Sequence, residues 1–266
     1  MSSVVNILGI DYDISITTHI DLSVKNLNYI PDSISLLINL QVLNLHNNNI
    51  DDIPNFIWSL TNLQNLNLSY NKLTNIPDAI SSLTNLRELH LYKTEITYIP
   101  DSISLLTNLQ KLLLHRNKIT DIPDSISLLT NLECLNLRSN KITNISPSIL
   151  LLTNLQILDL SRNQITNIPD SISLLTNLQE LYLYRNEITY IPDSISSLTN
   201  IQILHLSENH ITYIPDCISS LTTLQFLDLS ENHIDDLFLV SSMSIIDLIF
   251  SNQTPKPILY LPDIII

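Results

Sequence analysis

One sequence unit recurs along almost the whole chain, and no other feature constrains the fold as strongly. Residues 152–174, with the sequence LTNLQILDLSRNQITNIPDSISL, show this 23-residue unit, and closely similar segments precede and follow it. Its most regular member is one asparagine, which returns once in every unit except where Thr94 replaces it. We call these asparagines the asparagine ladder: Asn48, Asn71, Asn117, Asn140, Asn163, Asn186, Asn209 and Asn232. A fixed period of about 20–50 residues is typical of solenoid proteins.

Each unit contains a short alternating stretch that predicts a β-strand. Leu66 and Leu68 alternate with the polar residues Asn67 and Ser69, which indicates a strand with one buried face. One unit cannot bury this face alone, because ordering each residue costs about 1–2 kcal/mol of backbone entropy. The units must therefore stack, and their strands then form a parallel sheet along one side of the solenoid.

The ladder asparagine follows each predicted strand. In a buried turn its side-chain amide can both donate to and accept from the backbone of adjacent coils, which satisfies groups that would otherwise be buried unpaired. Thr94 cannot supply both functions as well, so we expect a weaker rung at this position.

The segment I-P-D-S-I-S predicts one turn of 3₁₀ or α-helix on the side opposite the sheet, with proline at the first helical position. In one repeat the proline moves one place along, to Pro147, so an irregular turn is expected there. A second asparagine column lies where the chain leaves this turn. Because Gly9 is the one glycine in the chain, these asparagines are expected to adopt left-handed conformations. The column comprises Asn39, Asn62, Asn85, Asn108, Asn131, Asn154, Asn177 and Asn200.

The frame L-x-x-L-x-x-L-x-L-x-x-N-x-I/L-x-x-I-P-x-x-I resembles the leucine-rich repeat family over about residues 14–237. The resemblance implies an α/β solenoid curved like a horseshoe, with a parallel sheet on its concave side and short 3₁₀ or helical turns on its convex side. The 23-residue spacing and the absence of cysteine caps are similar to intracellular repeats of the Ras-suppressor and scribble-like kind. That similarity implies a scaffold or regulator of signalling proteins.

The decay of the pattern at both ends predicts three parts. Residues 1–36 form an N-terminal cap with one degenerate repeat, residues 37–237 form the repeats, and residues 238–266 form a C-terminal cap or tail. Solenoids need such caps to cover their open hydrophobic ends. For residues 251–266 a frayed end is the alternative, since three prolines interrupt them.

Several absences point to an intracellular protein. The N-terminus does not resemble a secretory signal, and no segment is long enough to insert into a membrane. Cys134 falls on a predicted strand and Cys217 on a convex segment, so no disulfide is expected between them. We therefore expect a cytoplasmic protein in a reducing compartment, and a monomer.

The chain has a net charge of −14, yet its basic residues concentrate on one predicted surface. The positions that flank the strand leucines face the concave side and hold nine of the 12 Lys and Arg residues, but only eight of the 26 Asp and Glu residues. Most of the acidity therefore lies outside. A basic centre in the concavity would steer an anionic partner toward it.

We predict a partner-binding surface on the concave side, because Tyr and Arg are typical anchors of protein interfaces. The alternative is that polar residues simply fill solvated strand positions. The predicted surface comprises Lys111, His115, Arg116, Arg138, Arg162, Tyr182, Tyr184 and Arg185.

The sequence offers no catalytic motif. With a single glycine there is no phosphate-binding loop, dinucleotide fingerprint or nucleophile elbow, and neither cysteine has a local histidine. His210 and His233, with Glu208 and Glu231 beside them, could be drawn as a metal site. Duplication of the tetrad S-E-N-H explains the coincidence better. We therefore predict no enzymatic activity, no metal and no cofactor.

The most consistent function is a non-catalytic protein-binding module or scaffold, whose partner presents an acidic patch to the concave face. One alternative is the substrate-recognition part of a ubiquitin-ligase-type effector. Nucleic-acid binding through the central basic stripe is another alternative, which the net charge of −14 disfavours because it repels a long polyanion.

Overall fold

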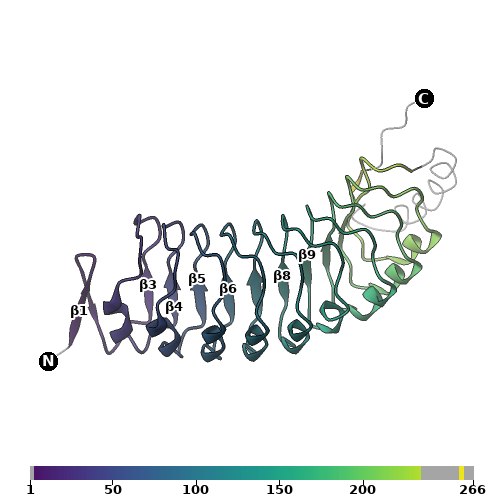
Figure 1. The fold of residues 1–266 in the computed structure, drawn as a ribbon. Coiled ribbons are helices and arrows are strands. Elements are labelled where there is room, and N and C mark those ends of the chain that lie inside the picture. Colours follow the sequence, from purple (N-terminus) through teal and green to yellow (C-terminus); the bar gives the residue numbers. More distant parts are fainter. Residues whose placement is uncertain (1–2, 235–257, 261–266) are drawn as a thin grey trace. The chain divides into compact units, whose positions relative to one another are not determined.

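The computed structural model describes residues 3–234 and 258–260. The chain divides into two compact units, residues 1–132 and residues 133–266. In both units every repeat is one coil, with a short strand on one side and a 3₁₀ turn on the other (Figure 1).

The first unit begins with a hairpin that the sequence pattern did not predict. Strands β1 (Val4–Ile7) and β2 (Ile10–Asp13) pair antiparallel, and the tight turn between them has positive φ angles at Leu8 (52°) and Gly9 (86°). Parallel strands, one in each repeat, follow in register. These strands are β3 (His19–Asp21), β4 (Val42–Asn44), β5 (Asn65–Asn67), β6 (Glu88–His90) and β7 (Lys111–Leu113).

The second unit continues the same pattern, and its strands also pair parallel and in register. They are β8 (Cys134–Asn136), β9 (Ile157–Asp159), β10 (Glu180–Tyr182), β11 (Ile203–His205), β12 (Phe226–Asp228) and β13 (Ile258–Tyr260). The last strand lies within the predicted C-terminal cap. The rest of residues 238–266 lies outside the described residues.

The leucines of the alternating pattern are buried, as the sequence predicted. In β5 the central Leu66 is fully buried while its neighbours Asn65 and Asn67 are half-buried, and the equivalent Leu89 and Leu112 are fully buried as well. Each fully buried leucine contributes about 1.5–3 kcal/mol of hydrophobic stabilisation, which helps to offset the entropy of ordering a coil.

The segments on the side of each coil opposite its strand are 3₁₀ helices, mostly of five residues. Proline is the N-cap and not the first helical residue, which corrects the predicted position. Its φ of −59° to −74° is followed by a ψ of 127–152°, so the proline is still extended, and its carbonyl accepts the first helical hydrogen bond. The helices are η1 (Asp32–Leu36), η2 (Asn55–Ser59), η3 (Asp78–Ser82), η4 (Asp101–Leu105), η5 (Asp124–Leu128), η6 (Ile149–Leu151), η7 (Asp170–Leu174), η8 (Asp193–Ser197) and η9 (Asp216–Ser220).

The displaced Pro147 has the predicted effect. Helix η6 is three residues long, and its N-cap Ser148 has a helical conformation (φ −65°, ψ −33°) where the other repeats have an extended proline. The prediction of an irregular turn in this repeat is therefore confirmed.

The left-handed residues are not the second asparagine column, so that prediction was wrong. Positive φ angles of 53–57° occur at the residue just before each ladder position, where the chain reverses after the strand. These residues are Asn47, Tyr70, Lys93, Arg116, Ser139, Arg162, Arg185, Glu208 and Glu231. A left-handed non-glycine residue costs about 1–2 kcal/mol, and the ladder hydrogen bonds that this turn makes possible offset the cost.

The second asparagine column serves another purpose. Asn62, for example, donates from Nδ2 to the Ile38 carbonyl oxygen of the preceding repeat over 2.9 Å. Asn85, Asn108 and Asn131 make the equivalent bond. These side chains join successive coils at the start of each strand.

The ladder asparagines lie in the turns after their strands, where all are buried except the half-buried Asn232. Asn71 donates from Nδ2 to the carbonyl oxygens of Leu68 (2.9 Å) and Leu45 (3.0 Å), and its Oδ1 accepts from the backbone N–H of Ile50 at 2.9 Å. The same pattern recurs at Asn163, Asn186 and Asn209.

Thr94 makes fewer hydrogen bonds than the asparagine that occupies this position in the other repeats. Its hydroxyl lies 3.0 Å from the Leu91 carbonyl oxygen and 2.6 Å from Oδ1 of Asn117, but it has one hydrogen to donate. The asparagines also bond to a carbonyl and an N–H of the preceding coil, which for this rung are those of Leu68 and Leu73. Within the described part of the chain, Thr94 makes neither of these two bonds.

We expect the substitution Thr94→Asn to raise the free energy of unfolding by about 0.5–1.5 kcal/mol, because it restores these backbone hydrogen bonds. Urea denaturation of both proteins measures the change, and Thr97→Asn at an exposed position of the same repeat is the matched control. A midpoint that stays the same or falls for Thr94→Asn would contradict this account of the rung.

Candidate functional site

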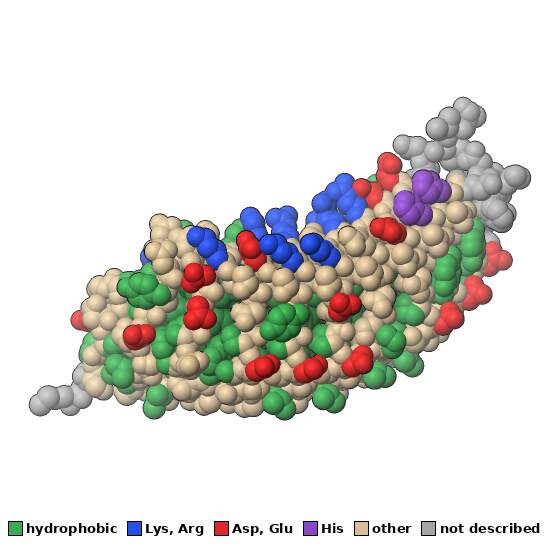
Figure 2. Space-filling view, viewed as in Figure 1, with side chains coloured by type: hydrophobic (Ala, Val, Ile, Leu, Met, Phe, Trp, Pro, Cys, Tyr) green, Lys and Arg blue, Asp and Glu red, His purple; other side chains and the backbone are tan. Residues whose placement is uncertain are grey.

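The candidate site lies on the sheet face. We define this face in each repeat as the outward strand residues together with the turn around the ladder position, for example Glu88, His90, Tyr92, Lys93 and Glu95. Figure 2 shows that in each unit Lys and Arg side chains gather along one border, whereas Asp and Glu side chains also spread over the remaining surface.

In the first unit, aromatic rings form a row across the sheet face. The ring centroids of His46 and Tyr70 lie 4.9 Å apart, those of Tyr70 and Tyr92 5.6 Å apart, and those of Tyr92 and His115 4.2 Å apart. Lys93 Nζ lies 4.2 Å from the Tyr70 ring centroid, a cation–π contact. His115 of the predicted partner surface thus belongs to a row that includes Tyr70 and Tyr92.

The basic residues on the sheet face of the first unit differ in how far nearby carboxylates balance their charge. Lys111 Nζ donates to Oε1 of Glu88 at 2.9 Å, and Lys118 pairs with Glu95 at 3.0 Å. Burial raises the pKa of Glu88, but the hydrogen bond and charge of Lys111 outweigh this, so the pKa lies below its usual value. Arg116 is exposed, and it has no ion pair among the residues that the structure describes.

In the second unit, two arginines converge on one tyrosine. The Cζ atoms of Arg138 and Arg162 lie 5.2 Å and 5.8 Å from the ring centroid of Tyr184. The ring of Tyr184 stacks on that of His205, with 4.4 Å between centroids and 24° between planes. These four residues, which we call the arginine–tyrosine cluster, hold three of the predicted partner-binding residues.

The remaining predicted residues of the second unit have partners of their own. Arg185 forms an ion pair with Glu208, and the hydroxyl of Tyr182 donates to Oε2 of Glu180 at 2.9 Å. Burial and this bond to Glu180 raise the pKa of Tyr182. Tyr182 also approaches His205, with ring centroids 6.2 Å apart. The structure therefore places the eight predicted residues in two groups, one in each unit.

His205 is a member that the sequence analysis did not select. Its Nε2 lies 2.9 Å from Oδ2 of Asp228 and 2.8 Å from Oγ of Ser207. Burial lowers the pKa of His205 in spite of the opposing charge of Asp228, which favours the neutral imidazole. The available signal was its position one repeat after Tyr182, which places both on the same column of adjacent strands.

The two histidines of the S-E-N-H tetrads, near the end of the second unit, do pack together. The rings of His210 and His233 stack with 5.3 Å between centroids, and Nδ1 of one lies 3.2 Å from Nε2 of the other. No group of three His, Cys, Asp or Glu side chains suited to a metal ion occurs within residues 3–234 and 258–260.

The cysteines lie where the sequence analysis placed them, Cys134 on β8 and Cys217 on η9, and they form no disulfide with each other. Burial and the nearby Asp193 raise the pKa of the Cys217 thiol to about 11. Because the thiolate is the reactive form, Cys217 is a poor nucleophile at neutral pH.

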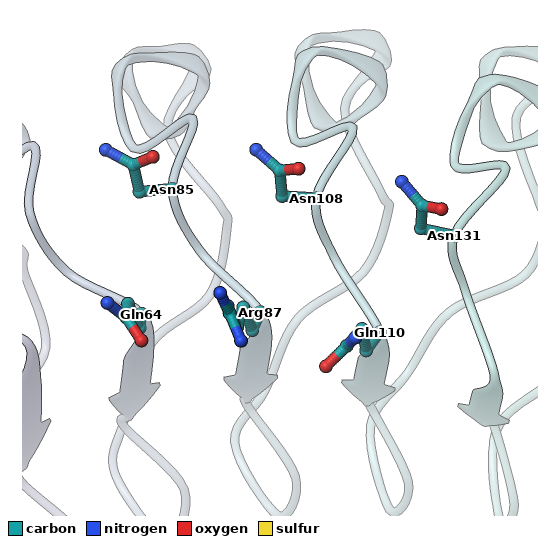
Figure 3. Close-up of a pocket in the computed structure, with 6 residues that line it drawn as sticks. All are labelled: Gln64, Asn85, Arg87, Asn108, Gln110 and Asn131. Carbon is teal, nitrogen blue, oxygen red and sulfur yellow. The ribbon is translucent and has the colours of Figure 1, made fainter.

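A polar groove lies in the first unit, beside the sheet face, at the beginning of the strands. This polar groove has a volume of about 400 Å³. Figure 3 shows Gln64, Arg87 and Gln110 just before β5, β6 and β7, with the asparagines on the preceding segments. Its lining residues are Gln64, Asn85, Arg87, Asn108, Gln110 and Asn131. Because the three asparagine amides already bond to backbone carbonyls, the groove offers mainly its glutamines and Arg87 to a ligand.

The repeats match models of a known protein family. Residues 38–96, 61–119, 130–188 and 176–234 match the family model described as leucine rich repeat, and residues 107–152 match the model of two copies of that repeat. The chain belongs to the leucine-rich repeat family. The fold is accordingly a leucine-rich repeat solenoid, as the sequence predicted. The narrower resemblance to Ras-suppressor and scribble-like repeats stays a prediction.

Solved structures of this family resemble the chain in fold and in sequence. A leucine-rich repeat protein of Leptospira interrogans is 31% identical, with a TM-score of 0.85 over 93% of this chain and 60% of its own. The plant peptide hormone receptor RGFR1, solved in complex with RGF2, is 32% identical, with a TM-score of 0.70 over 80% of this chain and 39% of its own. The chain thus spans less than two thirds of each of these relatives.

A third similar structure is the leucine-rich repeat ectodomain of the membrane receptor kinase GASSHO1/SCHENGEN3 from Arabidopsis thaliana, solved in complex with CASPARIAN STRIP INTEGRITY FACTOR 2. It is 32% identical, with a TM-score of 0.66 over 77% of this chain and 28% of its own. A comparison with curated proteins gives no match. Within the described parts of this chain, no helix has the length and apolar character needed to cross a membrane.

Proposed function

We propose that this leucine-rich repeat protein is a non-catalytic protein-binding module that receives a protein partner on its sheet face, the concave side of the predicted solenoid. The arginine–tyrosine cluster carries this proposal. Arginine and tyrosine are the residue types that anchor protein interfaces most often, because they combine a large contact area with directed hydrogen bonds.

The comparisons support a protein or peptide as the ligand class. Two of the similar structures are receptors solved in complex with RGF2 and with CASPARIAN STRIP INTEGRITY FACTOR 2. The surface chemistry of this chain supports a partner with an acidic patch, because Arg138 and Arg162 present positive charge on the sheet face of an otherwise acidic chain.

Charge reversal in the cluster, Arg138→Glu with Arg162→Glu, is expected to slow association with the partner by about tenfold or more at low salt, because steering depends on complementary charge. The difference from the native protein should shrink as salt is raised, since charges are screened over about 8 Å at physiological ionic strength. A partner isolated by pull-down from the native host cell, measured by surface plasmon resonance at two salt concentrations, provides the test.

Tyr182→Ala and Tyr184→Ala should act differently. An aromatic anchor contributes through buried contact area, so we expect faster dissociation with little dependence on salt, and a loss of about 1–2 kcal/mol of binding free energy for each. The same binding measurement separates the two effects, because association and dissociation are recorded independently.

The matched control is Asp170→Lys in η7, on the side of the second unit away from its strands. It reverses a charge in the same unit without touching the sheet face, and it should leave the affinity nearly unchanged. If this control weakens binding as strongly as the cluster variants do, the partner binds the convex side and the proposal is wrong.

A further inference from the structure

The arginine–tyrosine cluster brings two positive charges to one small region of the surface. His205 stacks on the Tyr184 ring at 4.4 Å, and the Cζ atoms of Arg138 and Arg162 lie 5.2 Å and 5.8 Å from the centroid of the same ring. Two like charges repel each other, and the negative face of the aromatic ring offsets part of that repulsion. An anion between them would offset the rest.

Neither guanidinium is occupied by a carboxylate. Among the residues that the structure describes, Arg138 and Arg162 take part in no ion pair, whereas the neighbouring Arg185 is paired with Glu208. The Nε atom of Arg138 is buried and has no hydrogen-bond partner. A buried donor without a partner is uncommon in folded proteins.

Carboxylates beside the cluster already have partners. Oδ2 of Asp228 lies 2.9 Å from Nε2 of His205, which is itself a member of the cluster. Oδ1 of the buried Asp159 accepts hydrogen bonds from the backbone N–H and the hydroxyl of Ser161. Glu180 accepts from the hydroxyl of Tyr182. Asp159 is close enough to feel the charge of Arg138 and reduces the local positive potential in part. The N–H groups of both guanidiniums nevertheless remain for an external acceptor.

The number of donors points to the chemistry of that acceptor. One planar guanidinium matches the two oxygens of one carboxylate, whereas a phosphate group offers three acceptor oxygens and can be bonded by two arginines at once. We propose that Arg138 and Arg162 form a phosphate site that receives a phosphorylated side chain of the protein partner. This inference rests on the proposed function and specifies the acidic patch of the partner.

Tyr184 has a positioning role in this site. Its ring face holds both guanidiniums, and its stacking on His205 fixes the plane of the ring. The phenol hydroxyl is not needed for this role, so Tyr184→Phe should bind phosphate as the native protein does, whereas Tyr184→Leu should bind it more weakly.

The site can be tested on the full chain without a known partner. Nuclear magnetic resonance of the ¹⁵N-labelled protein detects the Nε–H signals of its arginines, which Arg138→Lys and Arg162→Lys would assign. Titration with inorganic phosphate should move both signals in a saturable manner, and acetate or chloride at equal ionic strength should move them far less. Arg162→Gln should weaken phosphate binding by about tenfold or more, as expected for loss of a charge-assisted hydrogen bond.

Lys25→Gln, at an exposed cation in the first unit, is the control for general loss of charge and should leave the titration unchanged. Equal responses of the two arginine signals to phosphate, acetate and chloride would show unspecific screening and overturn the proposal. So would a phosphate affinity that is the same in Arg162→Gln and in the native protein.

A second measurement separates this inference from the proposed function. The isolated partner is treated with a phosphatase and bound again, and its affinity for the native protein should fall by about tenfold or more, whereas its residual affinity for Arg162→Gln should change little. Unchanged binding after phosphatase treatment would refute the phosphate site but leave the protein-binding function intact. If the sheet face binds no protein, the titration with inorganic phosphate still decides whether the anion site exists.

Discussion

Replacing Asn163 with alanine is expected to lower the free energy of unfolding by about 1–3 kcal/mol, because it leaves buried backbone groups without partners. The amide of Asn163 donates to the carbonyl oxygens of Leu160 at 2.9 Å and Leu137 at 3.1 Å, and it accepts from the N–H of Ile142 at 3.0 Å. Water cannot replace these bonds, since Leu137, Ile142 and Leu160 are fully buried. Asn140→Ala should act in the same direction.

The control is Gln164→Ala, one residue along. Its side chain is exposed, so the substitution should change the free energy of unfolding by less than about 0.5 kcal/mol. Denaturant unfolding followed by circular dichroism measures all three variants. Equal midpoints for Asn163→Ala and Gln164→Ala would mean that the ladder does not stabilise the coils as its hydrogen bonds imply.

The features that repeat were predictable from the sequence. A position that recurs once in every repeat has the same environment in each coil. The repeat that contains Leu66 and Asn71 therefore indicates where the strand, its buried face and the buried turn lie in the other repeats. Departures from the repeat were informative for the same reason. Thr94 and Pro147 each change one coil. The structure shows fewer hydrogen bonds at Thr94 and a shortened 3₁₀ helix after Pro147.

Local backbone conformation was predicted less well. Asparagine is the usual substitute for glycine at left-handed positions, yet the structure places this conformation at residues as different as Tyr70 and Glu208. The reason is that the hydrogen bonds of the ladder outweigh the preference of one residue. The N-terminal hairpin was missed as well, although its turn contains the one glycine of the chain.

The side-chain contacts of the candidate site were harder to predict from the sequence than the fold. The sequence analysis placed Lys111 on the partner-binding surface without a partner of its own chain, but Glu88 occupies the same position one repeat earlier and pairs with it. Comparing equivalent positions of adjacent repeats would have revealed this pair, and likewise Arg185 with Glu208. The convergence of Arg138 and Arg162 on Tyr184 depends on side-chain conformations across two repeats. The polar groove around Arg87 depends on the shape of the coils, which no local pattern encodes.

The second large effect is expected at the C-terminal end. Strand β13 pairs parallel with β12 in the register Phe226↔Ile258 to Asp228↔Tyr260, and the N–H of Leu229 donates to the Tyr260 carbonyl oxygen at 2.8 Å. We propose that this strand is part of the C-terminal cap predicted for residues 238–266. An exposed strand edge presents unpaired N–H and C=O groups that can pair with another chain.

Deletion of residues 256–266 removes β13, so we expect the melting temperature to fall by about 4 °C or more and the protein to associate at high concentration. Deletion of residues 238–266 should have a larger effect, because a solenoid without its cap exposes hydrophobic surface. Tyr260→Ala is the matched control. It removes the ring 5.8 Å from that of Phe226 but keeps the backbone of β13, and should cause only a small loss of stability. Light scattering and thermal melting of the three variants measure their association and their stability. If the protein without residues 256–266 stays monomeric and melts at the native temperature, β13 is dispensable.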